Sequence, residues 1–289
     1  MACRSARGCA DVVGTVAVVG LGLIGGSLAM AWSAAGIRVL GVEKDADTAR
    51  QALQAGAVAS LCPPDGISEA QAVVLAMAPH ACIAFLREYA AVLPRGAVVT
   101  DVCGVKQAVV AACEALCRPY GLRFVGGHPM AGKEHNGFGN AQADLFEGAS
   151  YILTPTDQTE PAALDTVRDL ALAAGCAGCT YTTPEEHDRR IAFTSQLPHV
   201  LAGAYVRSPQ CARHTGFSAG SYRDVSRVAA VDETLWSELF LQNRQALCEE
   251  IGGLVERLSA MQKALEEENT EKVAGLIRAG REAKEQLSE

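Results

Sequence analysis

His128 has a position in which an enzyme built on an α/β sheet could use a proton acceptor. His128 lies in GGHPMAGKEHNG (126–137), directly after an apolar run that is typical of a buried strand. Open α/β sheets bind ligands at the carboxyl ends of their strands, which is where this side chain would lie. A neutral histidine there could take a proton from a substrate hydroxyl while a hydride leaves the same carbon. A hydrogen-bonded core histidine explains the position equally well, so both interpretations stay open at this point.

Further titratable and charged side chains lie in the second half of the chain. We expect His187 and Asp188 to cap the start of a helix, and His199 to lie deeper in the same helix. Arg223 and Arg227 are four residues apart and share one face if that segment is helical. An arginine can hold a carboxylate through two parallel hydrogen bonds, although such a pair is more often a solvated surface.

The stretch GLGLIGG (20–26) follows an apolar strand pattern and precedes a helical pattern. In that context Gly20 permits a tight turn, Gly22 lets the backbone approach a pyrophosphate, and Gly25 lets the helix pack closely on the strand. The free N–H groups at the helix start would bind the phosphates. These features predict a dinucleotide site rather than a purely structural turn.

An acidic residue follows at the expected distance. Glu43 ends the next strand pattern, 23 residues after Gly20. A carboxylate there accepts hydrogen bonds from the adenosine ribose and repels a 2′-phosphate, so NAD is favoured over NADP as the cofactor. Lys44, the next residue, weakens this preference slightly.

These residues require strands that alternate with helices. Strands are predicted at 15–20, 38–43, 72–77, 97–102, 123–128 and 150–155, and helices at 25–35, 46–55, 81–93 and 106–117. Because the strand runs are apolar throughout, they predict a parallel sheet with both faces covered. After about Thr183 the pattern is helical to the end of the chain. We therefore predict an α/β parallel-sheet domain over 1–183 and an all-α domain over 184–289.

The helical part carries wide apolar stripes over some 105 residues. A single row of helices buries only part of such stripes, so a partner is expected to cover the rest. A homodimer formed through these helices is the simplest arrangement.

Composition narrows the class of protein. The 289 residues carry a net charge of −8, which argues against a nucleic-acid partner because such proteins are usually basic. The first residues lack the apolar core of a signal peptide, and the 11 cysteines follow no repeating frame, so we expect reduced thiols and a cytoplasmic location. The CxxC pair Cys176 and Cys179 has no second ligand pair, and no metal site is predicted.

The uncharged run Val12–Ile37 is long enough to span a bilayer, which takes about 20 apolar residues. Its first part is a β-branched strand pattern, its middle is the glycine loop, and only its end is helical. Glycine alone does not decide the matter, because membrane helices tolerate it. The acid at Glu43 and the sheet downstream favour a buried strand and cofactor loop, so no membrane span is predicted.

Taken together, the motifs resemble those of the prephenate/arogenate dehydrogenase family of tyrosine biosynthesis. The resemblance rests on VAVVGLGLIGGSLA, TDVCGVK, FVGGHPMAGKEHNGFGNAQADLFEGASYILTP, HDRRIAFTSQLPHVLA and SYRDVSRVA. It implies a Rossmann-like domain followed by a helical dimerisation domain. It also implies oxidative decarboxylation, in which NAD takes a hydride from the ring carbon that bears the 4-hydroxyl, carbon dioxide leaves and the ring becomes aromatic. The substrate would be prephenate or arogenate.

The resemblance also implies roles for single residues. His128 would accept the hydrogen bond of the 4-hydroxyl, and it must be neutral to do so. Arg227 would bind a substrate carboxylate, His199 would contact the substrate side chain, and Glu134 would gate or orient the pocket. Two more residues would line or support the site, namely Gly220 and Trp236. The residues expected at the cofactor are Gly20, Gly22, Leu23, Ile24, Gly25, Glu43, Pro79 and Cys103.

The sequence departs from the family pattern at two places. Where many members have a glycine and then a serine, this chain has Cys103 and Gly104, so the hydroxyl that would help orient the histidine is missing. A backbone group, a water or Thr100 could replace it. Gln196 stands where many members have a histidine, which suggests that this histidine is not essential. Lys106 follows the family pattern, but its role is not evident from the sequence.

Three other functions compete with a prephenate dehydrogenase. An arogenate dehydrogenase differs only in a substrate side chain that carries an ammonium in place of a ketone. A β-hydroxyacid dehydrogenase would share the glycine loop but would leave GGHPMAG and QLPH unexplained. A non-catalytic NAD-binding module would fit the missing serine but not the presence of His128, His199 and Arg227.

Overall fold

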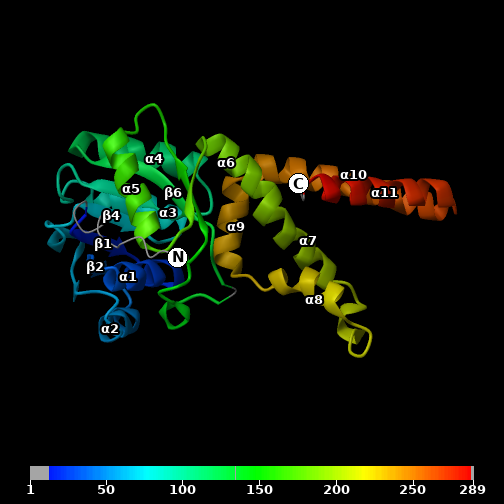
Figure 1. Ribbon diagram of the computed structural model, residues 1–289, viewed down its shortest axis with the longest axis horizontal. Coiled ribbons are helices and arrows are strands. Elements are labelled where there is room, and N and C mark those ends of the chain that lie inside the picture. The colour runs from blue at the N-terminus through cyan, green and yellow to red at the C-terminus, as the bar shows by residue number, and fades with distance from the viewer. Residues whose placement is uncertain (1–12, 134, 288–289) are drawn as a thin grey trace, which may run out of the picture.

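The computed structural model describes residues 13–133 and 135–287, which form a sheet domain followed by helices that extend from one side of it (Figure 1). Eight strands pair in the order β3-β2-β1-β4-β5-β6-β7-β8. Their bounds are β1 Thr15–Val19, β2 Arg38–Val42, β3 Ser60–Leu61, β4 Ala72–Leu75, β5 Val98–Asp101, β6 Arg123–Pro129, β7 Ser150–Thr154 and β8 Gly178–Tyr181. This arrangement confirms the predicted fold class.

One strand pair departs from the prediction of a wholly parallel sheet. β6 and β7 are antiparallel, with His128 opposite Ile152, whereas the other pairs are parallel. A parallel pair needs a crossover connection that returns the chain to the opposite end of the strands before the next strand begins. Among its described residues, the segment between Pro129 and Ser150 contains only a 3₁₀ turn, Phe138–Asn140, so β7 starts at the end of the sheet where β6 stops.

Helices cover both faces of this sheet. Their bounds are α1 Leu23–Ala34, α2 Ala46–Gln54, α3 Pro79–Tyr89, α4 Gln107–Cys117 and α5 Pro161–Ala173. Alternate residues of β1 point to opposite faces, so Val16 and Val18 join one core with α1, α2 and α5, while Ala17 and Val19 join another with α3 and α4. The central strands β1, β4 and β5 are buried almost throughout, which explains their continuous apolar runs.

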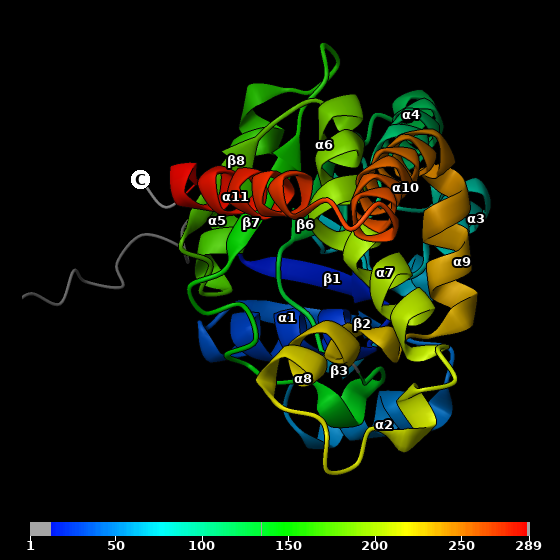
Figure 2. The ribbon, with the colours of Figure 1, turned by 90° about the vertical axis from the view of Figure 1, so that its right-hand side faces the viewer.

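The second part of the chain is helical, as predicted. Its helices are α6 Pro184–Ile191, α7 Leu197–Val206, α8 Gly220–Ser226, α9 Glu233–Gln242, α10 Arg244–Glu266 and α11 Thr270–Gln286. One π-helical turn, Ala192–Gln196, joins α6 to α7. α10 and α11 lie side by side and project away from the sheet domain as an arm (Figures 1 and 2).

The uncharged run at the start of the chain forms β1, the glycine loop and α1. Across the described residues, no helix combines the length and the apolar character needed to cross a membrane. The absence of charge in this run therefore follows from burial on both sides of the sheet.

Candidate active site

A cavity of about 360 Å³ opens between the carboxyl end of β6 and the helical part of the chain. The sheet domain supplies His128 and the residues that follow it, and the helices supply the opposite wall. The lining residues are His128, Pro129, Met130, Ala131, Gly132, Lys133, Asn136, Ser195, His199, Arg227, Val228, Ala230, Val231, Asp232 and Trp236. The cavity thus brings together His128, His199 and Arg227, which lie far apart in the sequence.

His128 is half-buried near the end of β6. Nδ1 of His128 lies 2.9 Å from Nε2 of His187 on α6. The other ring nitrogen of His128, Nε2, takes no part in this contact. Burial lowers the pKa of His128 well below its ordinary value, and the positive charges of His187, when protonated, and Lys106 act in the same direction. The ring is therefore neutral near pH 7 and able to accept a proton.

His187 and Asp188 do not cap their own helix, so that prediction is wrong. The cap of α6 is Thr183, whose hydroxyl accepts from the N–H of Glu186 at 3.2 Å. Asp188 instead accepts from the N–H groups of Lys106 at 2.7 Å and Gln107 at 2.9 Å, and so caps α4 from outside. The same carboxylate lies 2.7 Å from Nδ1 of His187. A local sequence pattern could not reveal these contacts, because they join distant segments.

The role of Lys106, which is not evident from the sequence, is structural. Its side chain is fully buried, and its ammonium pairs with the equally buried carboxylate of Asp101. The ammonium also donates to the carbonyl of Gly127 at 2.6 Å, one residue before His128. A buried ion pair is tolerated only when its remaining hydrogen bonds are satisfied, as they are here. Lys106 thereby ties the backbone that carries His128 to the end of β5.

His199 and Trp236 form the far wall of the cavity. Nδ1 of His199 lies 2.6 Å from the carbonyl of Val228, so it must donate and Nε2 must be the bare nitrogen of the neutral ring. The two rings pack with centroids 3.9 Å apart. Burial lowers the pKa of His199, and Arg227 nearby lowers it as well, while the bond to Val228 opposes the shift. Arg227 itself is exposed at the end of α8 and lines the cavity.

Gly104, which stands where many family members have a serine, lies beside His128. A Cβ atom added at Gly104 would lie 4.0 Å from Nε2 of His128 and 3.6 Å from Leu239. Cys103 is buried instead, and its thiol lies 3.5 Å from the carbonyl of Met77 and 3.7 Å from the sulfur of Cys82. The contact with Cys82 and burial raise the pKa of the Cys103 thiol well above its usual value. Thr100 is buried within β5, with its hydroxyl 3.4 Å from the carbonyl of Asp101.

Gln196, the other departure from the family pattern, is a buried structural residue. Its carbonyl accepts from Asn243 at 2.8 Å, and its amide donates to the carbonyl of Leu239 at 3.4 Å. Asn243 also donates to the carbonyl of Asp188 at 2.8 Å. The amide of Gln196 therefore joins the π-helical turn to α9 and α10.

The glycine loop has the shape that a dinucleotide requires. Gly20 has φ +88°, and a Cβ there would lie 2.6 Å from the carbonyl of Ala76. A Cβ at Gly25 would lie 2.0 Å from the carbonyl of Gly20, so any side chain would push α1 away from the loop. Around Gly22 the space is open, and it caps α1 with no side chain. The N–H groups at the start of α1 are thus available to a phosphate.

Glu43 closes the same site. Its two oxygens accept from the N–H of Leu21 at 2.7 Å and the N–H of Asp45 at 2.9 Å. Each carboxylate oxygen has two acceptor positions, so both can still accept from a ribose hydroxyl. The remaining cofactor candidates lie at the same edge of the sheet. Leu23 and Ile24 form the first turn of α1, and Pro79 is the buried first residue of α3. The residues present therefore fit a dinucleotide.

Two other residues, Glu134 and Ser195, belong to the predicted or the observed site. Glu134 lies outside the described residues, so its predicted gating role stays a prediction. Ser195, which the sequence analysis did not single out, lines the cavity from the π-helical turn. Its position four residues before His199 was the available signal, because residues four apart share a helix face.

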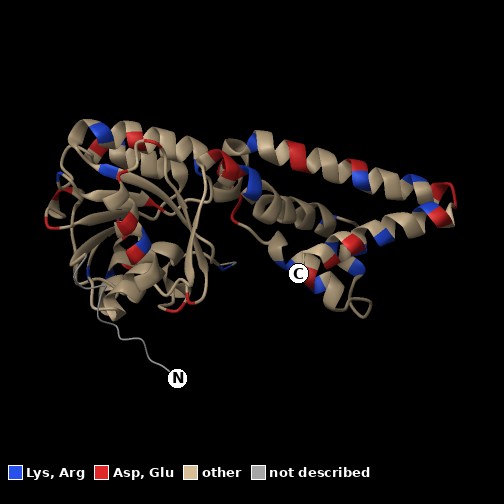
Figure 3. Cartoon of the chain, turned by 45° about the horizontal axis from the view of Figure 1, so that its top comes forward, with Lys and Arg blue, Asp and Glu red and all other residues tan. Residues whose placement is uncertain are grey.

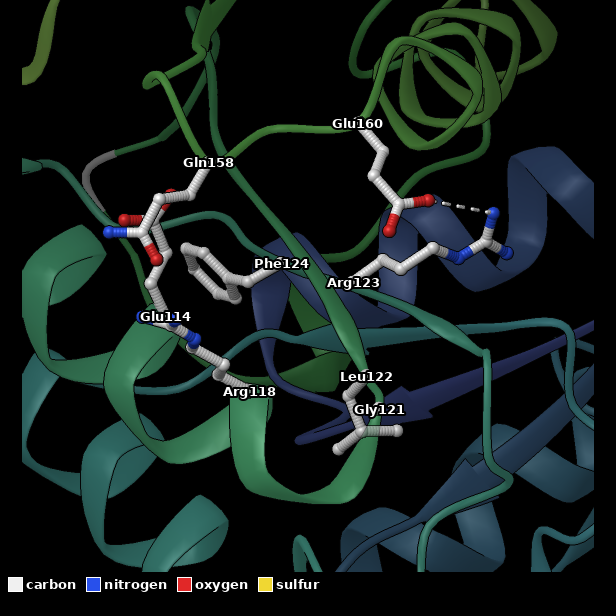
Figure 4. A pocket seen from close by; sticks show the side chains of 8 residues that line it. All are labelled: Glu114, Arg118, Gly121, Leu122, Arg123, Phe124, Gln158 and Glu160. Carbon is white, nitrogen blue, oxygen red and sulfur yellow. Dashed lines mark ion pairs between the residues drawn. The ribbon is translucent and has the colours of Figure 1, made fainter.

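A second hollow, of about 380 Å³, lies at the amino end of β6, opposite to His128 along the strand (Figure 4). Three of its charged side chains, Glu114, Arg123 and Glu160, pair with neighbouring groups. Arg123 lies 3.9 Å from Glu160 and donates to the carbonyl of Gly96 at 2.6 Å, while Glu114 accepts from Thr156 at 2.6 Å. Ligands of open α/β sheets bind at the other edge, so the chemistry belongs to the first cavity.

Two family models match the chain. The model described as "Prephenate dehydrogenase, nucleotide-binding domain" matches residues 28–177. The model described as "Prephenate dehydrogenase, dimerization domain" matches residues 183–279. The two matches together cover well over half of the chain.

Similar proteins carry related names. A prephenate dehydrogenase of Bacillus subtilis is 29% identical over 94% of this chain and 76% of the relative. The crystal structure of a prephenate dehydrogenase from A. aeolicus, in complex with hydroxyphenyl propionate and NAD+, has a TM-score of 0.85 at 26% identity and covers 94% of this chain and 98% of that one. The structure of a Synechocystis arogenate dehydrogenase has a TM-score of 0.80 at 26% identity, with coverage of 94% and 99%.

Proposed function

Since the chain belongs to the prephenate dehydrogenase family and is an oxidoreductase, we propose that it converts prephenate to 4-hydroxyphenylpyruvate with NAD in tyrosine biosynthesis. The observation that supports this most is the single cavity shared by His128, His199 and Arg227, at the carboxyl edge of a sheet with a dinucleotide loop. A core histidine at position 128 would need no such cavity. The proposed reaction is oxidative decarboxylation.

The reaction needs few groups from the protein. NAD+, when bound, supplies the acceptor for the hydride from the ring carbon that bears the hydroxyl. The bond to the ring carboxylate breaks, carbon dioxide leaves, and the electron pair of that bond completes the aromatic ring. Aromatisation drives this step, so the protein mainly positions the substrate and handles one proton.

His128 would handle that proton. Nε2 accepts the hydrogen bond of the 4-hydroxyl and takes its proton as the carbon–oxygen bond gains double-bond character. When carbon dioxide has left, the same nitrogen returns the proton to the phenolic oxygen, so no net proton is consumed at this atom. A neutral ring is required, and burial beside Lys106 provides it.

Arg227 and His199 would orient the substrate. The guanidinium of Arg227 would hold a carboxylate through two parallel hydrogen bonds. The bare Nε2 of His199, fixed by the bond of Nδ1 to Val228, would accept a hydrogen bond or contact the side chain of the substrate. Glu134 would gate or orient the pocket.

Arogenate is the second candidate substrate, and one feature of the cavity favours it. Asp232 lines the cavity, and its carboxylate, which caps α9 by accepting from the N–H of Leu235 at 2.8 Å, could also pair with the ammonium of arogenate. Lys133 on the opposite side would instead suit a carboxylate, which both substrates carry. The similarity to an arogenate dehydrogenase structure supports testing both.

The test compares four pairs of reactants. Purified protein is given prephenate or arogenate, each with NAD or NADP, and the absorbance band of the reduced nicotinamide is followed. We expect turnover with prephenate and NAD, and a His128→Asn variant should lose about 10²- to 10⁴-fold in kcat, the usual contribution of a general base. No turnover of any pair would contradict the proposed function, and full activity of the variant would contradict the role of His128.

The setting that we propose is a cytoplasmic homodimer. The nine cysteines in the described ranges are all free thiols, which fits a reducing compartment. The helical part matches a family model described as a dimerization domain. Its partner would be a second copy of this chain, joined through the C-terminal helices.

A further inference from the structure

Three side chains form a line that ends at the cavity. The carboxylate of Asp188 lies 2.7 Å from Nδ1 of His187, and Nε2 of His187 lies 2.9 Å from Nδ1 of His128. His187 and Asp188 are both buried, with 1% and 4% of their surfaces exposed. Neither lines the cavity, so neither can touch the substrate there.

The proton positions in this line follow from elementary rules. The carboxylate of Asp188 already accepts two backbone N–H groups at the start of α4, and a carboxylate can only accept. Nδ1 of His187 must therefore carry a hydrogen and donate it. Burial lowers the pKa values of both histidines, so both rings are neutral and each has one N–H. Nε2 of His187 is then bare, and only Nδ1–H of His128 can fill the contact between the rings.

We propose that His187, oriented by Asp188, is a positioning residue that fixes His128 in the tautomer whose Nε2 is unprotonated and faces the substrate. This inference rests on the proposed function, because it assigns how the proton acceptor of that reaction is prepared. In the opposite tautomer, Nε2 of His128 would carry a hydrogen and could not accept the hydroxyl proton. Two acceptors, Nδ1 of His187 and the Asp188 carboxylate, would also face each other at 2.7 Å.

The backbone around this line is held from two sides. Asp188 caps α4, and Lys106 at that cap reaches with its ammonium to Asp101 and to the carbonyl of Gly127. The charged groups around the two rings are thus Asp188, Asp101 and Lys106. Because they fix both ends of the line, the His128 ring is held in place as well as in protonation state.

A spectroscopic experiment tests the tautomer without any substrate. Protein labelled with ¹⁵N at histidine is studied by two-bond nitrogen–proton correlation spectra, which distinguish Nδ1–H from Nε2–H rings. The chain has six histidines, and the His128→Asn variant identifies the signals of His128. We expect Nδ1–H for both His128 and His187 near pH 7. An Nε2–H signal for His128 in the unsubstituted protein would overturn the proposal.

A pair of variants tests the consequence for the reaction. The amide of His187→Gln reaches the position of Nε2 and can still accept from His128, whereas the amide of His187→Asn reaches only the position of Nδ1. We expect kcat to fall about 10- to 100-fold in His187→Asn, the range typical of removing the partner that orients a metal-binding histidine. His187→Gln should retain most of the kcat, and KM should change little in either variant.

The outcomes separate this inference from the proposed function. Equal losses in both variants, or no loss in His187→Asn, would overturn the positioning role. The same two substitutions at His214, which stacks on Tyr222 and does not line the cavity, should leave kcat unchanged. If the unsubstituted protein turned over none of the four reactant pairs, the proposed function would fail, while the tautomer spectra would still decide the inference. Thermal unfolding and a titration with NAD show whether each variant is folded.

Discussion

His128 can accept a proton only while its ring is neutral. Below its pKa the ring is protonated and inactive, so kcat/KM should rise with pH through that pKa and then level off. Burial lowers the pKa of His128 well below the ordinary 6.5, so the rising limb should lie below pH 6.5 and the plateau should include pH 7. Initial rates measured between about pH 4.5 and pH 8 would check this expectation.

A midpoint at or above pH 6.5 would contradict the lowered pKa. The pKa of His199 is also lowered, so it could produce a similar limb. The limb should persist in a His199→Asn variant if His128 is the titrating group. Binding of NAD, followed by fluorescence over the same pH range, serves as the control for loss of the cofactor.

Gly104 offers a gain-of-function test at the residue scale. A Gly104→Ser side chain would make only ordinary contacts with Leu239, and its hydroxyl, on a Cβ 4.0 Å from Nε2 of His128, would lie beside the substrate hydroxyl that this nitrogen accepts. A hydroxyl there would orient the ring and the substrate hydroxyl, and a neutral hydrogen bond contributes about 0.5–1.5 kcal/mol. We therefore expect kcat to rise about two- to tenfold.

The matched control is Gly104→Ala, which adds the Cβ without the hydroxyl. It should leave kcat unchanged or slightly lower. An equal rise in the two variants would mean that filling space, and not the hydroxyl, is responsible, and a fall in Gly104→Ser would contradict the idea that this position lacks a useful group.

The sequence revealed the parts of the site that carry local signals. His128 follows a strand pattern within an unusual motif, and His199 lies in another. His187 and Asp188 carry no such signal for their true role, because their partners are 59 and 82 residues away in the chain. Only the packing of α6 against α4 and β6 creates that role. Nothing local distinguishes an aspartate that caps its own helix from one that caps another.

At the scale of single elements, the end of β2 should decide which dinucleotide is used. Glu43 sits there, and its negative charge would repel a 2′-phosphate. A Glu43→Gln variant keeps the size of the side chain and can still accept from Leu21, but it loses the charge. The ratio of kcat/KM with NAD to that with NADP should fall at least tenfold, since one charge near a protein surface contributes about 4 kcal/mol at 4 Å.

Glu69 provides the control for this prediction. It is an exposed carboxylate that pairs with Arg38 at the opposite end of the same strand, at 3.0 Å. Glu69→Gln should leave the cofactor ratio unchanged. If the two variants behaved alike, the preference would not come from the end of β2.

Strands and helices with strong hydrophobic patterns were predictable from the sequence. Those that depend on the surrounding fold were not. The apolar strands β1, β4 and β5 and the helices between them were expected close to their observed bounds. β3 has two residues and β8 is a half-exposed strand, so neither shows a clear pattern. Helix α5 is missing from the prediction, although the proline at its first position and its buried row of Ala163, Val167 and Leu170 are helical signals. The antiparallel direction of β7 depends on the path of a loop, which no periodicity encodes.

At the scale of the whole molecule, the arm of α10 and α11 exposes more apolar surface than a monomer needs. Leu247, Ile251 and Leu254 of α10 pack against the other helices. Farther along the arm, four large side chains are each more than half exposed, namely Val255, Leu258, Leu265 and Ile277. Basic and acidic residues are interspersed along the two helices of the arm (Figure 3).

This exposed apolar surface predicts a dimer, and charged side chains substituted into the surface should dissociate it. Exposed apolar patches of this kind mark association sites, and a closed dimer covers each copy with the same surface of the other. The unsubstituted protein should run at twice its chain mass of 30.2 kDa in light scattering coupled to size exclusion. Leu258→Glu combined with Ile277→Glu should run near 30.2 kDa, because two buried charges without partners would face each other across the interface.

The control places the same charge on an exposed leucine outside the arm. Leu53 on α2 is 46% exposed in the sheet domain, and Leu53→Glu should leave the mass at that of the dimer. The melting temperature of the unsubstituted protein should rise with protein concentration, and that of the doubly substituted protein should not, because only association couples stability to concentration. A mass near 30.2 kDa for the unsubstituted protein at micromolar concentration would contradict the dimer, and the apolar arm would then require a different partner.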